Sequence, residues 1–174
     1  MPRIYISYRI EDANIVRQIV RRCLQTYGNY SVIANPQASL PPNIALKQHI
    51  DNLMFSTQSI LLVIGPDWAG IDKYGRFKLS SADIPIGTEV RLALRSEKQV
   101  ILVLVNGAQL PYADSVPDDL QAIFQLPIAR LRDKIFQQDL NQLIPPPSLS
   151  NKLLYYFSLA WTKNYIRFDD EAMY

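Results

Sequence analysis

The sequence has one cysteine, Cys23, and one histidine, His49, among 174 residues. A single cysteine cannot form an internal disulfide, and these two side chains lack the spacing of zinc ligands. A lone histidine on a predicted helix also argues against a Ser-His-Asp hydrolase. We therefore expect no disulfide within the chain, no metal site and no hydrolase triad.

Glycine is scarce as well, with six residues in the chain. No Gly-x-Gly-x-x-Gly motif follows the first predicted strand, which spans residues 4–8. In Rossmann oxidoreductases that motif lets the backbone approach the pyrophosphate of a dinucleotide cofactor. Its absence argues against a redox enzyme with a bound nicotinamide cofactor.

The chain also lacks a large excess of charge of one sign and any long apolar run. The formal net charge is +2, and Arg17, Arg21 and Arg22 recur on the polar side of a predicted helix, as on a solvated face. No apolar run reaches the ~20 residues that cross a bilayer, and the first residues lead into a strand pattern without a signal peptide. We expect a cytoplasmic protein that binds neither nucleic acid nor membranes.

The sequence does contain an alternation of apolar runs and amphipathic segments. Residues 60–64 and 100–105 are apolar throughout, as in strands buried on both faces of a parallel sheet. Shorter strand patterns and helical patterns alternate around them: strands at 4–8, 31–34 and 127–131, and helices at 12–27, 44–55, 83–96, 118 onward and 133–143. This order predicts an α/β domain with a five-stranded parallel sheet in the flavodoxin-like order 2-1-3-4-5 and helices on both faces.

Local signals indicate where these elements begin and end. Asp12 and Asp133 are predicted N-caps, and Gly28 is a predicted C-terminal stop of the first helix. Three prolines at 145–147 end the last helix, so we place the domain at residues 1–144. The aromatic segment within 145–174 is either a helix that packs back on the domain or a surface for docking or oligomerisation.

Four stretches, in this order, resemble a bacterial TIR (Toll/interleukin-1 receptor) domain. They are IYISYR at 4–9, LPPN at 40–43, SILLVIGPDW at 59–68 and EVRLAL at 89–94. The resemblance covers roughly residues 3–143 and implies the three-layer TIR fold. It also implies a role in prokaryotic signalling or defence, with a separate sensor or effector protein as a candidate partner.

Catalytic members of this family cleave the nicotinamide–ribose bond of NAD+, which is their substrate rather than a cofactor. Glu89 matches the catalytic glutamate by position, and an ionised carboxylate would stabilise the oxocarbenium-like ribose in hydrolysis or cyclisation. Its predicted place near a helix start favours the ionised form. Taken without its neighbours, Glu89 is no more distinctive than the solvated Glu97. Pro85 and Gly87 stand where the family commonly has an aromatic residue and an arginine.

The resemblance implies a substrate pocket around Glu89 at the carboxyl ends of the strands. Its candidate substrate-binding residues are Ser7, Tyr8, Arg9, Asn35 and Trp68. Tyr8 would otherwise pack at the strand end, and Asn35 would otherwise shape its own turn. Trp68 either stacks on a flat ring of the ligand or caps the core below a loop.

The alternative function is a non-catalytic scaffold or adaptor. TIR domains associate with one another, commonly through the loop after the second strand, called the BB loop. The candidate contacts are Pro41, Pro42, Asn43 and Ile44, and the expected partners are other TIR domains in a homo-oligomer formed on activation. A phospho-receiver domain fits less well, because Asp67 lies two residues past the strand-end Gly65 and Arg132 stands where a lysine is needed.

Overall fold

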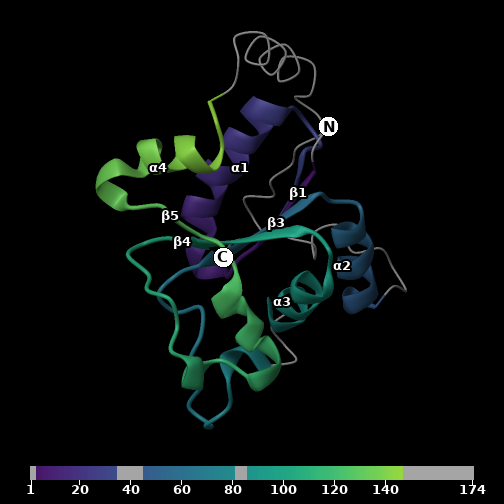
Figure 1. The fold of residues 1–174 in the computed structure, drawn as a ribbon, viewed down its shortest axis with the longest axis vertical. Helices are drawn as coiled ribbons and strands as arrows, with labels where there is room; N and C mark the ends of the chain where they lie inside the picture. The colour runs from purple at the N-terminus through teal and green to yellow at the C-terminus, as the bar shows by residue number, and fades with distance from the viewer. Residues whose placement is uncertain (1–2, 35–44, 81–85, 147–174) are drawn as a thin grey trace.

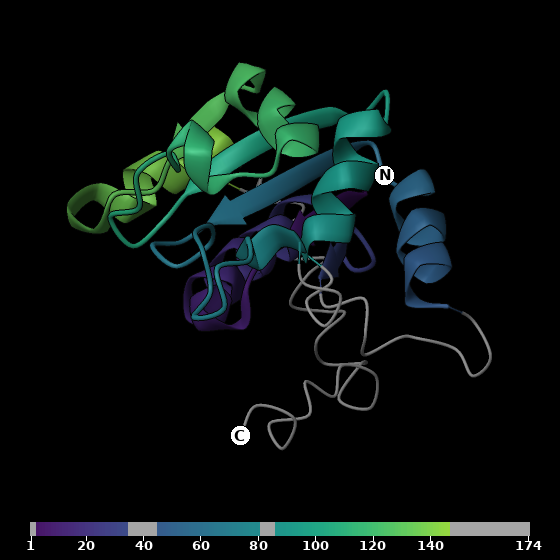
Figure 2. The same ribbon diagram turned by 90° about the horizontal axis from the view of Figure 1, so that it is seen from below.

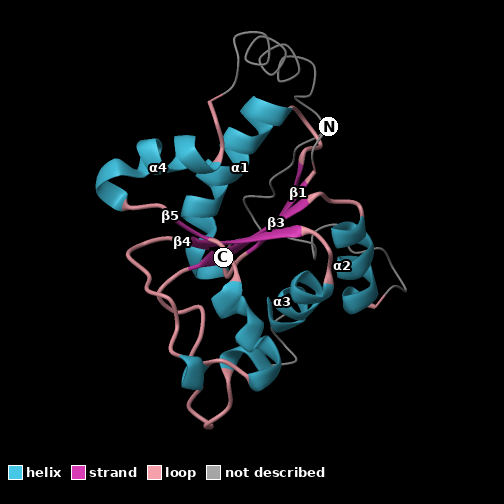
Figure 3. Ribbon diagram, in the orientation of Figure 1, coloured by secondary structure: helices cyan, strands magenta, loops and turns pink. Residues whose placement is uncertain are grey.

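The computed structural model describes residues 3–34, 45–80 and 86–146 of the chain (Figure 1). Its centre is a five-stranded parallel sheet in the order β2-β1-β3-β4-β5, drawn in magenta in Figure 3. The strands are β1 (Ile4–Ser7), β2 (Val32–Ala34), β3 (Ser59–Ile64), β4 (Gln99–Leu104) and β5 (Ile128–Arg130). The predicted sheet order is confirmed.

In the described ranges, four α-helices cover the two faces of the sheet: α1 (Ala13–Tyr27), α2 (Leu46–Phe55), α3 (Ile86–Arg95) and α4 (Phe136–Leu143). α1 and α4 lie on one face, and α2 lies beside α3 on the other (Figure 1, Figure 2). Short 3-10 helices join these elements: η1 (Ile10–Asp12), η3 (Lys78–Ser80), η4 (Ala113–Ser115), η5 (Asp118–Gln125) and η6 (Asp133–Ile135). The predicted three-layer α/β architecture is therefore present.

A hydrophobic core lies on each side of the sheet, and the central strands contribute residues to both. In β3, Ile60 and Leu62 are buried on the side of α2 and α3, whereas Leu61 and Val63 are buried on the side of α1 and α4. Successive side chains of a strand point to opposite faces, so a strand between two helical layers needs apolar residues at every position. In the part of the chain that the structure describes, no helix is both long and apolar enough to cross a membrane.

The helix ends confirm the predicted stop at Gly28 and the predicted N-cap position of Asp12, and they correct the prediction for Asp133. Gly28 caps α1 with φ 90°, and its N–H donates to the Leu24 carbonyl. Asp12 precedes α1 but makes no side-chain cap, because its carboxylate accepts a hydrogen bond from Asn106 at 2.9 Å. Asp133 does not cap a helix either, since it is the first residue of η6 and Arg132 stands at the cap position.

The basic side of α1 is only partly solvated. Arg17 and Arg21 are exposed, as predicted. Arg22 instead joins α1 to α4, donating from Nη1 to Asn141 Oδ1 and from Nη2 to Gln137 Oε1, the latter at 3.2 Å. The prediction that Arg22 belongs to a free solvated face is wrong, because α4 packs beside that part of α1.

A buried carboxylate fixes the start of the last helix. Asp139 is 4% exposed and accepts three bonds from Arg132: from its backbone N at 2.8 Å, Nε at 2.9 Å and Nη2 at 2.7 Å. These donors lower the pKa of Asp139 to about 2. The residue therefore ties the segment after β5 to α4.

We expect acid to weaken the domain through Asp139. Because its pKa in the folded chain lies below the ordinary 3.8, the stabilisation is present above about pH 4 and is lost as the pH falls toward 2. The melting temperature of the wild type should drop over this interval, and Asp139→Asn should melt lower at neutral pH with a smaller acid-induced drop. Asp51→Asn, at an exposed position, is the control. An unchanged pH dependence in Asp139→Asn would contradict the assignment.

Gly87 allows α3 to approach η3. A Cβ added at Gly87 would lie 1.8 Å from the carbonyl oxygen of Leu79, which is a backbone atom. No side chain fits there unless one of the two segments moves. This close approach therefore depends on the absence of a side chain at position 87.

We expect Gly87→Ala to lower the free energy of unfolding by about 1–3 kcal/mol, the usual effect of overpacking. The result is diagnostic because helix propensity alone would favour alanine by ~1 kcal/mol. Urea denaturation measures the change, with Thr88→Ala as the control for propensity in the same turn. A gain in stability for Gly87→Ala would show that η3 moves away at little cost.

Candidate functional site

Glu89 lies in the first turn of α3 and is 4% exposed. The chain leaves β3 at the carboxyl edge of the sheet, so the start of α3 returns to that edge. The carboxylate points toward β1, where the Tyr5 hydroxyl donates to Oε1 at 3.0 Å and the Ser7 hydroxyl donates to Oε2. The structure thus joins the candidate catalytic residue to the end of the first strand.

The local sequence explains this arrangement. Tyr5 and Ser7 are two residues apart in β1, so their side chains point to the same face of the sheet. On that face lie the buried residues Ile86 and Val90 of α3, which hold the helix against the sheet. With α3 anchored in this way, Glu89 faces the two hydroxyl groups.

Burial governs the ionisation of Glu89. Removal from water raises the pKa of the carboxyl, and the hydrogen bonds from Ser7 and Tyr5 oppose that shift without cancelling it. Among the described residues, no lysine or arginine forms an ion pair with Glu89. Within the described part of the chain, the ionised side chain would therefore be a buried negative charge held by two neutral donors.

Tyr8 and Arg9 follow Ser7 but differ in their relation to Glu89. Burial, and to a smaller extent the charge of Glu89, raises the pKa of Tyr8, whose side chain packs against the core on the side of α1 and α4. Arg9 donates from Nη2 to Glu11 at 3.2 Å, and its side chain is 12% exposed. Its Nε and Nη1 are buried without an acceptor in the described part of the chain.

The remaining predicted site residues are not gathered at Glu89 by the described structure. Trp68 is 1% exposed and belongs to the core on the side of α2 and α3, so its ring packs below the loop after β3. Asn35 and the BB-loop residues Pro41, Pro42, Asn43 and Ile44 lie outside the described residues, as does Pro85. The aromatic segment within 147–174 lies outside them too.

Tyr5 was missed by the sequence reasoning, although a signal was available. It is two residues before Ser7 in a predicted strand, so alternation alone places the two side chains on one face. The sequence gives no sign that Glu89, 84 residues away, would meet them. That proximity depends on how α3 packs against β1.

Asp12, predicted from the sequence only as an N-cap, is a second buried carboxylate at the same edge of the sheet. It is 4% exposed, and a Cβ added at Gly65 would lie 2.1 Å from each of its carboxylate oxygens. With its bond from Asn106, it links the segments after β1, β3 and β4. Burial, the largest influence, raises the pKa of Asp12. This tight packing is what a structural carboxylate requires.

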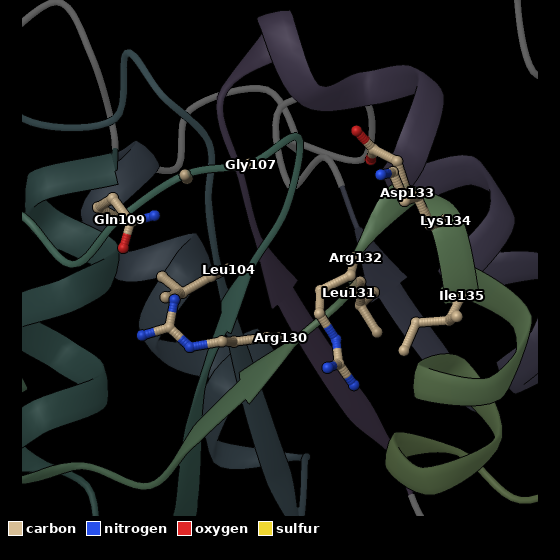
Figure 4. A pocket seen from close by; sticks show the side chains of 10 residues that line it. Leu104, Gly107, Gln109, Arg130, Leu131, Arg132, Asp133, Lys134 and Ile135 are labelled. Atoms are coloured by element: carbon tan, nitrogen blue, oxygen red, sulfur yellow. The ribbon is translucent and has the colours of Figure 1, made fainter.

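A groove of about 550 Å³ lies at the carboxyl ends of β4 and β5. Figure 4 shows Gln109 and Arg130 on one side of it and Lys134 and Ile135 on the other. None of the predicted site residues lines it. Its exposed cations are accompanied by Asp133, so the groove has no uniform charge. Within the described ranges, no cluster of three or more His, Cys, Asp or Glu side chains is placed to hold a metal ion.

Comparisons with known proteins give similarities in sequence and in structure. No family model matches the chain. The ATP-dependent Clp protease ATP-binding subunit ClpX of Treponema denticola is 26% identical over 178 residues, an alignment that covers 97% of this chain and 40% of that protein. The chain therefore spans well under half the length of this curated relative.

The structural comparison concerns the fold. The crystal structure of a prokaryotic SEFIR domain matches with a TM-score of 0.50 and 13% sequence identity, covering 82% of this chain and 96% of that one. A similarity at this identity shows the architecture alone. Together with the strand order β2-β1-β3-β4-β5, it shows that the chain has a TIR-like fold.

Proposed function

We propose that this TIR-like domain is a cytoplasmic signalling or defence module that cleaves the nicotinamide–ribose bond of NAD+ when it self-associates. Glu89 is the proposed catalytic residue. The observation that carries the proposal is its carboxylate, buried at the carboxyl edge of the sheet and held by the hydroxyls of Tyr5 and Ser7. Fold similarity alone would not support an activity.

The reaction makes a modest demand that this carboxylate meets. Nicotinamide departs as a neutral molecule, and the ribose passes through an oxocarbenium-like state with positive charge at the bond that breaks. A carboxylate beside the ribose stabilises that charge most effectively where water is excluded. The two hydroxyl donors orient Glu89 and leave its negative charge in place, whereas a lysine or arginine would neutralise that charge.

The burial of the Glu89 carboxylate lowers the stability of the folded chain. An ionised carboxylate loses its hydration when it is buried, and neutral donors restore only part of that loss. Strongly perturbed carboxyls of this kind are concentrated at functional sites. The raised pKa of Glu89 therefore supports a chemical role for this residue.

Other residues have subsidiary places in the proposal. Ser7 contacts Glu89, and Tyr8 follows it at the end of β1, so both would contact the ribose in this proposal. Arg9 has two buried N–H groups that find no acceptor among the described residues, and it would offer them to an anionic part of the substrate. We keep Asn35 and Trp68 as proposed substrate contacts, the latter requiring its ring to leave the core. The BB-loop residues 41–44 remain the proposed contact with a second TIR domain.

Incubation of the purified full chain with NAD+ tests the proposal. Nicotinamide is separated by chromatography at increasing protein concentration and after enforced clustering, with Glu89→Gln alongside the wild type. Release by the wild type that is lost in Glu89→Gln supports the enzyme, and the identity of the second product distinguishes hydrolysis from cyclisation. Absence of release from the clustered wild type would overturn it.

A scaffold is the second candidate, and the burial of Glu89 also bears on it. Both oxygens of the carboxylate already have hydrogen-bond donors, as in a residue whose role is to fasten α3 to β1. A scaffold would assemble with other TIR domains, and with a separate sensor or effector, without consuming NAD+. Light scattering of the wild type and Glu89→Gln, measured beside the nicotinamide assay, separates the two functions.

A further inference from the structure

We infer that the Tyr5 hydroxyl is a positioning group for Glu89, fixing one oxygen of its carboxylate from the core side of the site. The inference rests on the proposed NAD+ cleavage and deepens it. It concerns a residue that the resemblance to TIR domains does not assign. Its basis is the hydrogen bond from Tyr5 Oη to Glu89 Oε1 at 3.0 Å.

Tyr5 acts through Glu89 because it cannot reach a ligand itself. The side chain is 0% exposed and lies within the core on the side of α2 and α3. Ser7 is two residues nearer than Tyr5 to the carboxyl end of β1, so a substrate at that edge of the sheet would lie nearer to Ser7 than to the phenol. Tyr5 is therefore a positioning residue rather than a catalytic one.

The two donors to Glu89 have different mechanical properties. The Tyr5 ring is rigid and packed on all sides, so its hydroxyl has a fixed position. Ser7 is the last residue of β1, and its hydroxyl can rotate from Glu89 to a ribose hydroxyl. Tyr5 would hold the carboxylate in place while Ser7 exchanges its partner.

Electrostatics supports this division. Burial and the nearby Glu89 raise the pKa of the Tyr5 phenol above its ordinary value, so Tyr5 remains a donor throughout the neutral range. Its hydrogen bond favours the ionised form of Glu89 and opposes the effect of burial on that carboxyl. Loss of the hydroxyl should therefore raise the pKa of Glu89 further.

The other titratable groups around α3 are the same in the two chains that the test compares. Tyr8 is coupled electrostatically to Glu89. The elements packed against α3 are β1, α2, η3 and η5. Besides Tyr5, their titratable residues are Lys47, His49, Asp51, Lys78, Asp118 and Asp119. A comparison of two chains that differ only at Tyr5 cancels these contributions.

Tyr5→Phe tests the inference because it removes the hydroxyl and keeps the ring. We expect kcat for nicotinamide release to fall roughly tenfold, as for loss of a hydrogen bond to a charged group, with little change in KM. The acid limb of the pH–kcat profile should move to higher pH, since the reaction needs ionised Glu89. Infrared titration of the Glu89 carboxyl, assigned by difference from Glu89→Gln, should show the same upward shift.

Tyr27→Phe is the matched control, since Tyr27 packs in the core on the opposite face of the sheet. It should leave both the titration and the pH profile unchanged. An unshifted Glu89 titration in Tyr5→Phe would overturn the inference, whatever the activity. A wild type that releases no nicotinamide would overturn the proposed function, and the infrared titration would then decide about Tyr5 by itself.

Discussion

Glu89→Gln is expected to reduce nicotinamide release by about 10²–10³-fold, the usual effect of removing one preorganised electrostatic group. Glutamine has nearly the shape of glutamate and can still accept a hydrogen bond from Tyr5 or Ser7. What it lacks is the negative charge that would stabilise the ribosyl cation. Glu97→Gln, at an exposed position two residues after α3, should keep full activity. Undiminished release by Glu89→Gln would exclude Glu89 as the catalytic residue.

The same variant should be more stable than the wild type at neutral and alkaline pH. The pKa of Glu89 is raised in the folded chain, so stability is lost as the pH rises through that pKa and the buried carboxyl ionises. Glutamine has no such ionisation. Thermal melts should therefore show an advantage of a few degrees for Glu89→Gln that disappears in acid.

Loss of activity with gain of stability would identify Glu89 as a residue retained for function. Equal melting temperatures at all pH values would show instead that the hydroxyl donors fully compensate the buried charge. A lower melting temperature in Glu89→Gln at neutral pH would favour the scaffold, in which Glu89 fastens α3 to β1.

Trp68→Ala is expected to lower the free energy of unfolding by about 3–5 kcal/mol, as when other large core side chains are truncated to alanine. Trp68 is 1% exposed and belongs to the same core as Ile64 and Leu79, where removal of the indole leaves a cavity. Urea denaturation of the two chains measures the difference. The effect on stability should exceed any effect on ligand binding.

Tyr74→Ala provides the control in the segment between β3 and α3. Tyr74 is 69% exposed, so its truncation should change the free energy of unfolding by no more than about 0.5 kcal/mol. A similarly small change for Trp68→Ala would show that the indole spends much of its time outside the core. Its ring would then be available to stack on a ligand.

The sequence by itself determined the layers and the strand order. Residues 60–64 and 100–105 are apolar at every position, as in strands covered on both faces. The alternation of these strands with amphipathic helices then leaves few topologies, and the observed order β2-β1-β3-β4-β5 is the predicted one. These properties follow from hydrophobic periodicity, which depends only on residues a few positions apart in the sequence.

The local polar signals were less reliable because a carboxylate takes the best donor available to it. Asp12 turns from the helix end to Asn106, and Asp139, which no pattern distinguished, binds Arg132 through three donors. Arg22 likewise donates hydrogen bonds to Asn141 and Gln137 of α4. Such choices depend on which elements lie beside one another.

Only part of the candidate site could be predicted from the sequence. Glu89 and Ser7 were marked by their resemblance to TIR motifs, but only the tertiary structure joined them and added Tyr5. The chain between them is more than eighty residues long, and no local preference encodes a contact across that distance. Packing of α3 against β1 decided which hydroxyls meet the carboxylate, because hydrogen bonds act over about 3 Å whereas hydrophobic periodicity fixes only the face that each element buries.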